Sequence, residues 1–198
     1  MNTTDFYNAK STQLIERYDN AKMSSLHQLL VKYIPSKSKV LDIGFGSGRD
    51  LQFLYDNGYN VWGIDPAKKF VENAKIRFPE KKDHFFEEGI PFREKSLGKM
   101  LKFDAVIVIA VWMHLRYDQY SETIENIANV SRPGCVVVIS YSEGERYDED
   151  ERYFESVDLE NLIELFSVKD FELIKTIKNE DSLKRNSLSW VTLVFKHD

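Results

Sequence analysis

The chain has 198 residues, of which 42% are hydrophobic and 30% charged, a balance typical of one globular domain. Its formal charge of −5 argues against a polyanionic partner, and a single cysteine excludes an intrachain disulfide and a cysteine-cluster metal site. No signal peptide is recognisable, and the longest apolar run, residues 105–113, is about half of a membrane span. We therefore expect one cytoplasmic domain over residues 1–198 that neither enters a membrane nor holds a metal.

Helical and strand patterns alternate along most of the chain. In chain order they predict helices at 12–18 and 24–34, a strand at 39–43, a helix at 49–58, a strand at 59–65, a helix at 66–78, strands at 84–88 and 103–111, a helix at 117–130, a strand at 133–141, a helix at 157–168, and strands at 171–178 and 189–196. Apolar strands separated by helices predict an α/β fold with a mostly parallel sheet covered on both faces. The last two strands, joined through 179–188, predict a hairpin.

A glycine-rich stretch, "VLDIGFGSGRD" at residues 40–50, follows the first strand. In this architecture ligands bind beyond the carboxyl ends of the strands. Asp65 ends the second strand, 21 positions after Gly44, where a carboxylate suits the hydroxyls of a ribose. A pyrophosphate beside Asp42 would meet like charge. A nucleoside with a cationic end and no phosphate therefore fits better than a dinucleotide, and S-adenosylmethionine is such a ligand.

Five segments in succession resemble the motifs of the class I S-adenosylmethionine-dependent methyltransferases. They are "VLDIGFGSGRD", "VWGIDP", "EGIPF", "FDAVIVIAVWMHL" and "SRPGCVVVIS". The G-S-G-R-D loop, the A-V-W-M-H-L motif and the final "SLSW" are similar to one branch of small bacterial enzymes. The resemblance, which runs from about residue 38 to the end, implies a Rossmann-like fold with seven strands, the last antiparallel. It also implies an N-terminal helical lid, residues 1–36, and a catalytic core, residues 37–198.

The resemblance implies that Asp42 and the backbone of the loop hold the methionine part of S-adenosyl-L-methionine or its product S-adenosyl-L-homocysteine. Asp65 would accept from both ribose hydroxyls, a role compatible with a helix cap. Arg49 would pair with the ligand carboxylate, or would be a solvated helix residue. The glycines could instead serve only a tight turn. The implied cofactor-binding residues are Asp42, Gly44, Phe45, Gly46, Gly48, Arg49, Asp65, Pro66, Glu88, Gly89 and Ile109.

Glu88 departs from the pattern of this branch, which usually has Asp at that position near the adenine amino group. After the fourth strand, Trp112 would wall the sulfonium by a cation–π contact, and His114 is the best general-base candidate. The alternative for His114 is a structural role. If this stretch is extended, Trp112 and His114 point the same way and Met113 points the other way.

The acceptor is inferred from missing features. The chain has neither the Asn/Asp-Pro-Pro-aromatic stretch of amino-methylating DNA enzymes nor a basic patch for phosphates. An acidic segment, residues 143–155, carries seven carboxylates and would repel nucleic acid. We therefore expect a small-molecule acceptor. The alternatives are an RNA- or protein-directed methyltransferase and a cofactor-binding module without turnover.

Overall fold

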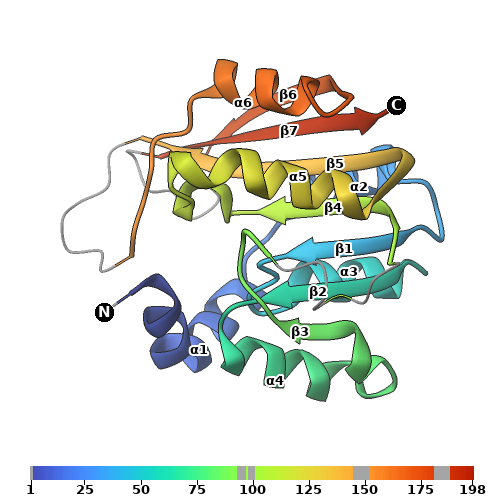
Figure 1. Ribbon diagram of the computed structural model, residues 1–198. Helices are drawn as coiled ribbons and strands as arrows, with labels where there is room; N and C mark the ends of the chain where they lie inside the picture. The colour runs from blue at the N-terminus through green and yellow to red at the C-terminus, as the bar shows by residue number, and fades with distance from the viewer. Residues whose placement is uncertain (1, 93–96, 98–100, 145–151, 181–187) are drawn as a thin grey trace.

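The computed structural model describes residues 2–92, 97, 101–144, 152–180 and 188–198. Within them, seven strands form one sheet in the order β3-β2-β1-β4-β5-β7-β6 (Figure 1). The strands are β1 (Lys39–Ile43), β2 (Asn60–Asp65), β3 (Phe85–Glu87), β4 (Phe103–Ile109), β5 (Ser131–Glu143), β6 (Phe171–Glu180) and β7 (Ser189–His197). Strand β7 is antiparallel to β5 and β6, while the pairs among β1 to β5 are parallel. The predicted α/β fold is confirmed.

Each predicted helix is present. They are α1 (Thr3–Asp19), α2 (Ser24–Tyr33), α3 (Arg49–Asp56), α4 (Lys68–Arg77), α5 (Tyr120–Val130) and α6 (Leu159–Ser167). Short 3₁₀ segments are η1 (Pro79–His84), η3 (Trp112–His114) and η4 (Tyr117–Gln119). However, α1 begins nine residues earlier than predicted, and α4, α5 and α6 begin two or three residues later. Helix α1 starts earlier than its apolar pattern because the Asn2 side chain caps it, accepting from the Asp5 nitrogen at 2.8 Å. Helix α4 starts two residues later than predicted, so Pro66 lies before its first turn.

Two predicted segments are only partly described. The acidic segment 143–155 and the connection 179–188 fall largely on residues 145–151 and 181–187, which lie outside the described residues. What surrounds them is described: β5 ends at the start of the first segment, and β6 and β7 pair with each other across the second.

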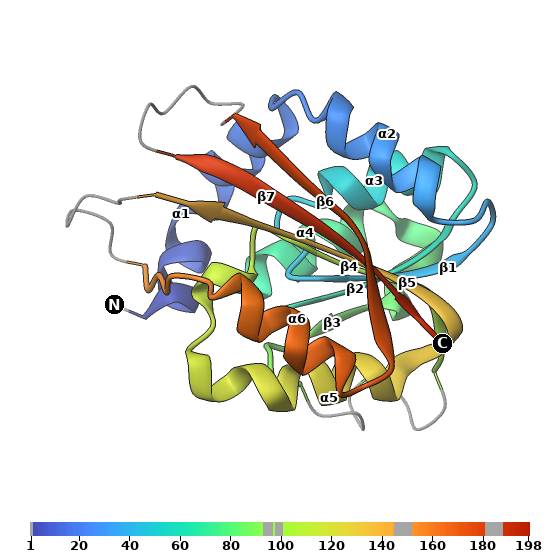
Figure 2. The same ribbon diagram turned by 90° about the horizontal axis from the view of Figure 1, so that it is seen from above.

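Alternation along the buried strands divides the core into two layers. Leu41 and Val106 face the layer that contains the apolar residues of α5 and α6. Val40 and Ala105, one position earlier, face the layer that contains those of α1, α2, α3 and α4. Figure 2 shows α2 and α3 on one side of the sheet, with α5 and α6 on the other. Full burial of one aliphatic side chain contributes about 1.5–3 kcal/mol, so both layers stabilise the central strands β1, β2 and β4.

Candidate functional site

Two buried carboxylates lie on one face of the sheet, at the carboxyl ends of neighbouring strands. Asp42 of β1 pairs in register with Gly63 of β2, and Asp65 is two residues further along β2. Residues two apart on a strand share a face, so the register brings both acids to the side that carries α1 to α4. Their exposed fractions are 2% for Asp42 and 5% for Asp65. The two acids predicted from the sequence therefore belong to one site.

The glycine loop between β1 and α3 needs glycine for two different reasons. Gly44, Gly46 and Gly48 all have positive φ, at 72°, 56° and 82°, a conformation that side chains disfavour. A Cβ on Gly44 would also lie 2.4 Å from Cγ2 of Val111. On Gly46 it would meet only Tyr18, at 4.0 Å. The backbone of Gly46 therefore borders space beneath α1, which is what a cradle for a ligand requires.

Asp65 organises the loop through both of its oxygens. Oδ2 accepts from the Gly46 nitrogen at 2.9 Å, and Oδ1 accepts from the Ala67 nitrogen at 2.8 Å. Burial raises the pKa of Asp65 to about 7, although these two donors act in the opposite direction. Each carboxylate oxygen has a further lone pair, so the side chain can still accept from two hydroxyls.

Asp42 is buried without compensation. Burial raises its pKa well above the ordinary value, and the negative charges of Asp50 and Asp65 add to that effect. Arg49 acts in the opposite direction, but no hydrogen bond joins it to Asp42 among the described residues. A buried carboxylate without a partner is costly unless a cation comes to it. This arrangement fits the ammonium group of the predicted cofactor.

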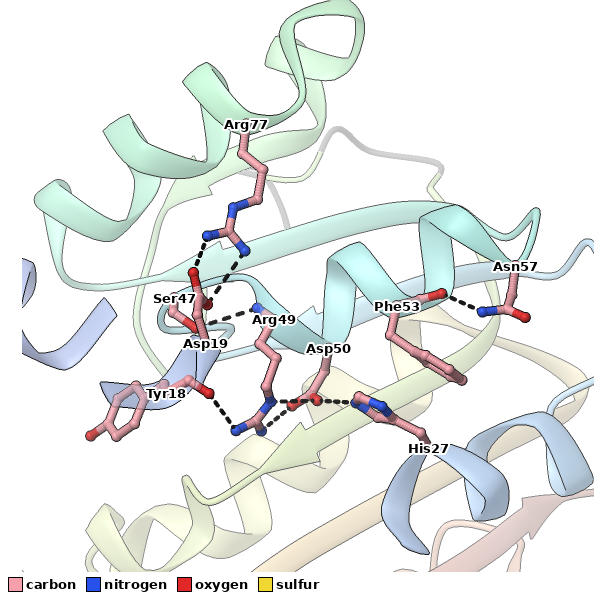
Figure 3. A network of polar contacts seen from close by, with 9 residues as sticks. All are labelled: Tyr18, Asp19, His27, Ser47, Arg49, Asp50, Phe53, Asn57 and Arg77. Carbon is pink, nitrogen blue, oxygen red and sulfur yellow. Dashed lines mark hydrogen bonds and ion pairs between the residues drawn. The ribbon is translucent and has the colours of Figure 1, made fainter. Parts of the chain in front are cut away.

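Arg49 has a different partner from the one predicted. Its Nε and Nη2 donate to the two oxygens of Asp50 at 3.0 and 2.8 Å, and Nη1 donates to the Tyr18 carbonyl at 3.2 Å. His27 Nε2 donates to the same Asp50 carboxylate at 2.7 Å. Figure 3 shows Asp50 held between Arg49 and His27. The guanidinium is thus held by protein groups rather than by solvent, and its pairing with a ligand carboxylate stays a prediction.

Asp50 is the member of this network that the sequence did not single out. Burial alone would raise its pKa, but the hydrogen bonds from His27 and Arg49 lower it to about 2. The network connects α2, α3 and the end of α1. A further ion pair joins Arg77 of α4 to Asp19 at the end of α1, also drawn in Figure 3. These charges fix α1 over the glycine loop.

The remaining predicted cofactor residues fall around the same end of the sheet. Phe45 packs inward, filling the space where a Cβ on Gly63 would lie at 2.5 Å from its ring. Glu88 follows β3, and its nitrogen donates to the Asp65 carbonyl at 3.2 Å. A Cβ on Gly89 would be 3.6 Å from Pro66. The last of them, Ile109, ends β4 on the face of Asp42.

The segment after β4 is not extended, so the condition under which Trp112 and His114 would point the same way is not met. Ala110 has φ of 61°, and residues Trp112–His114 form the 3₁₀ turn η3. Trp112 is fully buried against Tyr120 and Phe166, at 5.2 and 6.0 Å between ring centroids. The cation–π contact with a sulfonium stays a prediction, made for an indole that is also part of the core.

His114 meets the N-terminal helix instead. Its Nε2 lies 3.0 Å from the Tyr7 hydroxyl, and its Nδ1 lies 2.7 Å from the Tyr153 carbonyl. Arg152 Nη1 donates to the same Tyr7 hydroxyl at 3.2 Å. Sequence reasoning missed Tyr7 and Arg152 as site residues, because they lie 107 and 38 positions from His114 and belong to no motif. The sequence signal for Tyr7 was an aromatic side chain in a predicted lid.

Helix α1 covers the site through contacts along its whole length. Thr3 Oγ1 accepts from the Tyr153 nitrogen at 2.9 Å, and Asn8 Oδ1 accepts from the Lys69 nitrogen at 3.1 Å. The ring of Tyr7 lies 6.0 Å from that of Phe70. The described part of the chain holds no cluster of His, Cys, Asp or Glu side chains that could bind a metal ion. The same residues include no helix that is long and apolar enough to cross a membrane.

Comparisons with known proteins cover nearly the whole chain. A family model described as a methyltransferase domain matches residues 15–184. A protein of Staphylococcus carnosus, named an uncharacterized methyltransferase, is 24% identical over 174 residues, 81% of this chain and 80% of that protein. The 1,6-didemethyltoxoflavin-N1-methyltransferase of Burkholderia thailandensis, crystallised with 1,6-didemethyltoxoflavin and S-adenosylhomocysteine, has a TM-score of 0.76 and 18% identity over 98% of this chain and 87% of its own. The magnesium protoporphyrin IX methyltransferase of Synechocystis, crystallised with bound SAM, has a TM-score of 0.71 and 17% identity. The match covers 98% of this chain and 95% of that protein's chain.

Proposed function

Because this chain belongs to the methyltransferase domain family and is an S-adenosylmethionine-dependent methyltransferase, we propose that it methylates a small molecule held beneath helix α1. The observation that carries the proposal is the closure of the site. Hydrogen bonds from Tyr7 to His114 and from Tyr153 to Thr3 join α1 to the segments that follow β4 and β5. A ligand on the glycine loop would therefore be covered by α1.

The chain's residues fit S-adenosylmethionine at three points. Asp42 offers an uncompensated buried carboxylate to the ammonium group. Gly46 offers backbone bordered by open space, and Asp65 offers free lone pairs to the ribose hydroxyls. A pyrophosphate in the same place would face two carboxylates, which disfavours a dinucleotide.

When bound, S-adenosylmethionine supplies a methyl carbon on a positively charged sulfur that leaves with its electron pair. The protein has to hold the acceptor in line with that bond and to exclude water. Alignment of this kind supplies roughly 7–11 kcal/mol of the barrier reduction. Helix α1 serves both requirements, since its aromatic residues Phe6 and Tyr7 form the cover.

Three considerations favour a small acceptor over RNA or protein. The chain's net charge of −5 gives no electrostatic attraction for phosphates. The hydrogen bonds of α1 to the segments after β4 and β5 would have to break before a macromolecule could reach the glycine loop. The two solved neighbours named above carry the names of small-molecule methyltransferases. An RNA- or protein-directed enzyme would need α1 displaced on binding, and a module without turnover would need no such cover.

The experiment has two parts. Calorimetry should show binding of S-adenosylhomocysteine and none of NAD, and Asp65→Ala should weaken binding by about 1.5–3 kcal/mol, the range for a hydrogen bond to a charged group. Isotope-labelled donor, incubated with the protein and cell extract, should then label compounds that pass a small-molecule filter. Label confined to the RNA or protein fraction would assign the acceptor to the alternative class. Preference for NAD over S-adenosylhomocysteine would contradict the cofactor site itself.

A further inference from the structure

The hydrogen bonds around His114 fix its tautomer. The Tyr153 carbonyl can only accept, so the 2.7 Å contact requires a proton on Nδ1 of His114. In the neutral ring Nε2 then carries a lone pair. The Tyr7 hydroxyl, 3.0 Å away, must donate to it. The direction of the Tyr7–His114 hydrogen bond therefore follows from a backbone carbonyl.

The oxygen of Tyr7 is prepared to accept. A phenol hydroxyl has two lone pairs, and Arg152 Nη1 donates to one of them at 3.2 Å. The guanidinium is held in place by rings, with its central carbon 5.2 Å from the centroid of Phe6 and 4.9 Å from that of Phe154. Within the described parts of the chain no other group donates to this oxygen, so its second lone pair is open to a donor from the acceptor. The positive charge beside the oxygen stabilises negative charge as it develops there.

The pair lies at the cofactor end of the sheet. Asp65 is near enough to act electrostatically on Tyr7, whose ring also contacts Phe70 at the start of α4. His114 follows closely on Val111, which fills the space beside Gly44. Burial raises the pKa of Tyr7, with Tyr18 and Asp65 acting in the same direction and Arg152 in the opposite one. The resting hydroxyl is therefore protonated at neutral pH, so it can transmit a proton but does not store a negative charge.

We propose that Tyr7 and His114 form a proton relay, and that the acceptor is consequently a compound with an ionisable hydroxyl or ring N–H. The inference rests on the proposed function. The bond between the acceptor atom and its proton breaks, and its electron pair remains to form the bond to the methyl carbon. The acceptor's proton moves to the oxygen of Tyr7 while the proton of Tyr7 moves to Nε2 of His114. The chain ends with a neutral tyrosine and an imidazolium.

The relay assigns separate parts to three side chains. Tyr7 touches the acceptor, His114 receives the proton through Tyr7, and Arg152 positions the hydroxyl. A tertiary amine or a thioether has no proton to give and gains nothing from this arrangement. The acceptor class follows from that difference, since only a group with a removable proton uses the relay.

A spectroscopic test needs no acceptor. In protein labelled with ¹⁵N-histidine, two-bond ¹⁵N–¹H spectra should show His114 protonated on Nδ1. Tyr7→Phe should shift the Nε2 resonance of His114 and leave the fold intact by circular dichroism. Tyr55→Phe, a matched change on the exposed side of α3, should leave that resonance in place. Protonation of His114 on Nε2 would overturn the relay, because Tyr7 could then donate nothing to it.

An activity test addresses the acceptor class. Labelled donor is offered with catechols, hydroxylated aromatic acids and fused heterocycles that carry a ring N–H, and with the same compounds already methylated at those atoms. Transfer should occur only to the first set, and Tyr7→Phe should lower kcat about 10²-fold or more while the Kd for S-adenosylhomocysteine stays within about threefold. Equal transfer to the capped set, or full activity of Tyr7→Phe, would overturn the inference. Failure to bind S-adenosylhomocysteine would instead overturn the proposed function.

Discussion

Asp42 and Asp50 stand at the two ends of the glycine loop, and both are buried, yet their pKa values move in opposite directions. Burial raises the pKa of Asp42, whose carboxylate accepts no hydrogen bond among the described residues. Asp50 experiences the same burial, but His27 and Arg49 surround it with donors and lower its pKa to about 2. Among the described residues, the carboxylate of Asp50 therefore has hydrogen-bond donors and that of Asp42 has none.

This difference separates structure from function within one loop. A buried charge with its own partners stabilises the fold, while a buried charge without them costs stability until a ligand arrives. Asp50 therefore holds α1, α2 and α3 together. Asp42 keeps an energetic cost that binding of a cation would relieve. If the comparison is right, substitutions at the two ends must have opposite consequences.

The largest effect is expected from the loop that separates them. Gly46→Val should lower affinity for S-adenosylhomocysteine below detection, because its Cβ branch would fill the space now bordered only by Tyr18. Positive φ adds strain of about 1–2 kcal/mol. Gly58→Val is the matched control, since Gly58 has φ of 82° and no atom near its missing Cβ. Calorimetry should show loss of binding in the first variant alone. Equal binding by both would remove the backbone cradle from the site.

Neutralising the two acids should produce crossed effects. Asp42→Asn should weaken S-adenosylhomocysteine binding by about 1.5–3 kcal/mol, the range for hydrogen bonds to a charged group. The ligand-free protein should become more stable at pH 8, because a neutral amide does not pay for burial of a charge. Asp50→Asn should instead lower the free energy of unfolding by about 3 kcal/mol, since it leaves Arg49 without its partner. Urea denaturation measures the free energy of unfolding of both variants, and calorimetry measures their affinity for S-adenosylhomocysteine. A change in the free energy of unfolding of the same sign in both variants would contradict the comparison.

The sequence predicted one side of this comparison and not the other. Asp65 is the last residue of β2 and Asp42 the last but one of β1, and period-two alternation is enough to bring them together. Asp50 looks like an ordinary residue in the first turn of a helix. Its partner His27 is on another helix, 23 positions earlier. Contacts between separate helices depend on packing angles that no local pattern carries, and for the same reason the contact of Arg49 with the Tyr18 carbonyl was not predicted.

The segment after β4 shows a second limit. Its apolar residues continue the pattern of the strand, and an extended backbone would point Trp112 and His114 in the same direction. The backbone turns instead at Ala110, which adopts a positive φ without being a glycine. Nothing local predicts that turn, because alanine disfavours it and only the surrounding structure imposes it. The contact between Tyr7 and His114 depends on the same turn, so it could not be predicted from the sequence.

A pH dependence should distinguish the two kinds of acid. The folded-state pKa of Asp65 is about 7, above its unfolded value, and that of Asp42 is also raised. Such groups contribute stability below the unfolded pKa and lose it as pH rises through the folded pKa. The ligand-free protein should therefore lose of order 2–4 kcal/mol between pH 5 and pH 8. Asp50, with its depressed pKa, loses stability only toward pH 2, so it adds no slope here.

Denaturation at each pH measures this slope, and Asp65→Asn provides the control. The variant should have a flatter profile between pH 5 and pH 8. Saturating S-adenosylhomocysteine should flatten the parent's profile as well, because its ammonium compensates the ionised Asp42. An unchanged slope in Asp65→Asn would assign the titration to other groups.

The smallest effect should come from the ion pair between Arg77 and Asp19, which joins α4 to the end of α1. Its side chains are 22% and 32% exposed, so solvent screens the pair and Arg77→Gln should cost no more than about 1 kcal/mol. The effect should be local, because Arg49 still donates to the Tyr18 carbonyl beside it. Hydrogen exchange should accelerate in α1 and nowhere else.

Lys178→Gln, which breaks an exposed pair with Glu143 on β5, is the matched control and should leave exchange in α1 unchanged. S-adenosylhomocysteine affinity should stay within about threefold in both variants, since neither touches the two carboxylates of the site. Faster exchange throughout the molecule in Arg77→Gln would mean that this pair belongs with Asp50, as part of the fold's own charge network. Exchange that accelerates in α1 alone would show that the pair holds only the end of this helix, as expected for a weak, partly exposed contact.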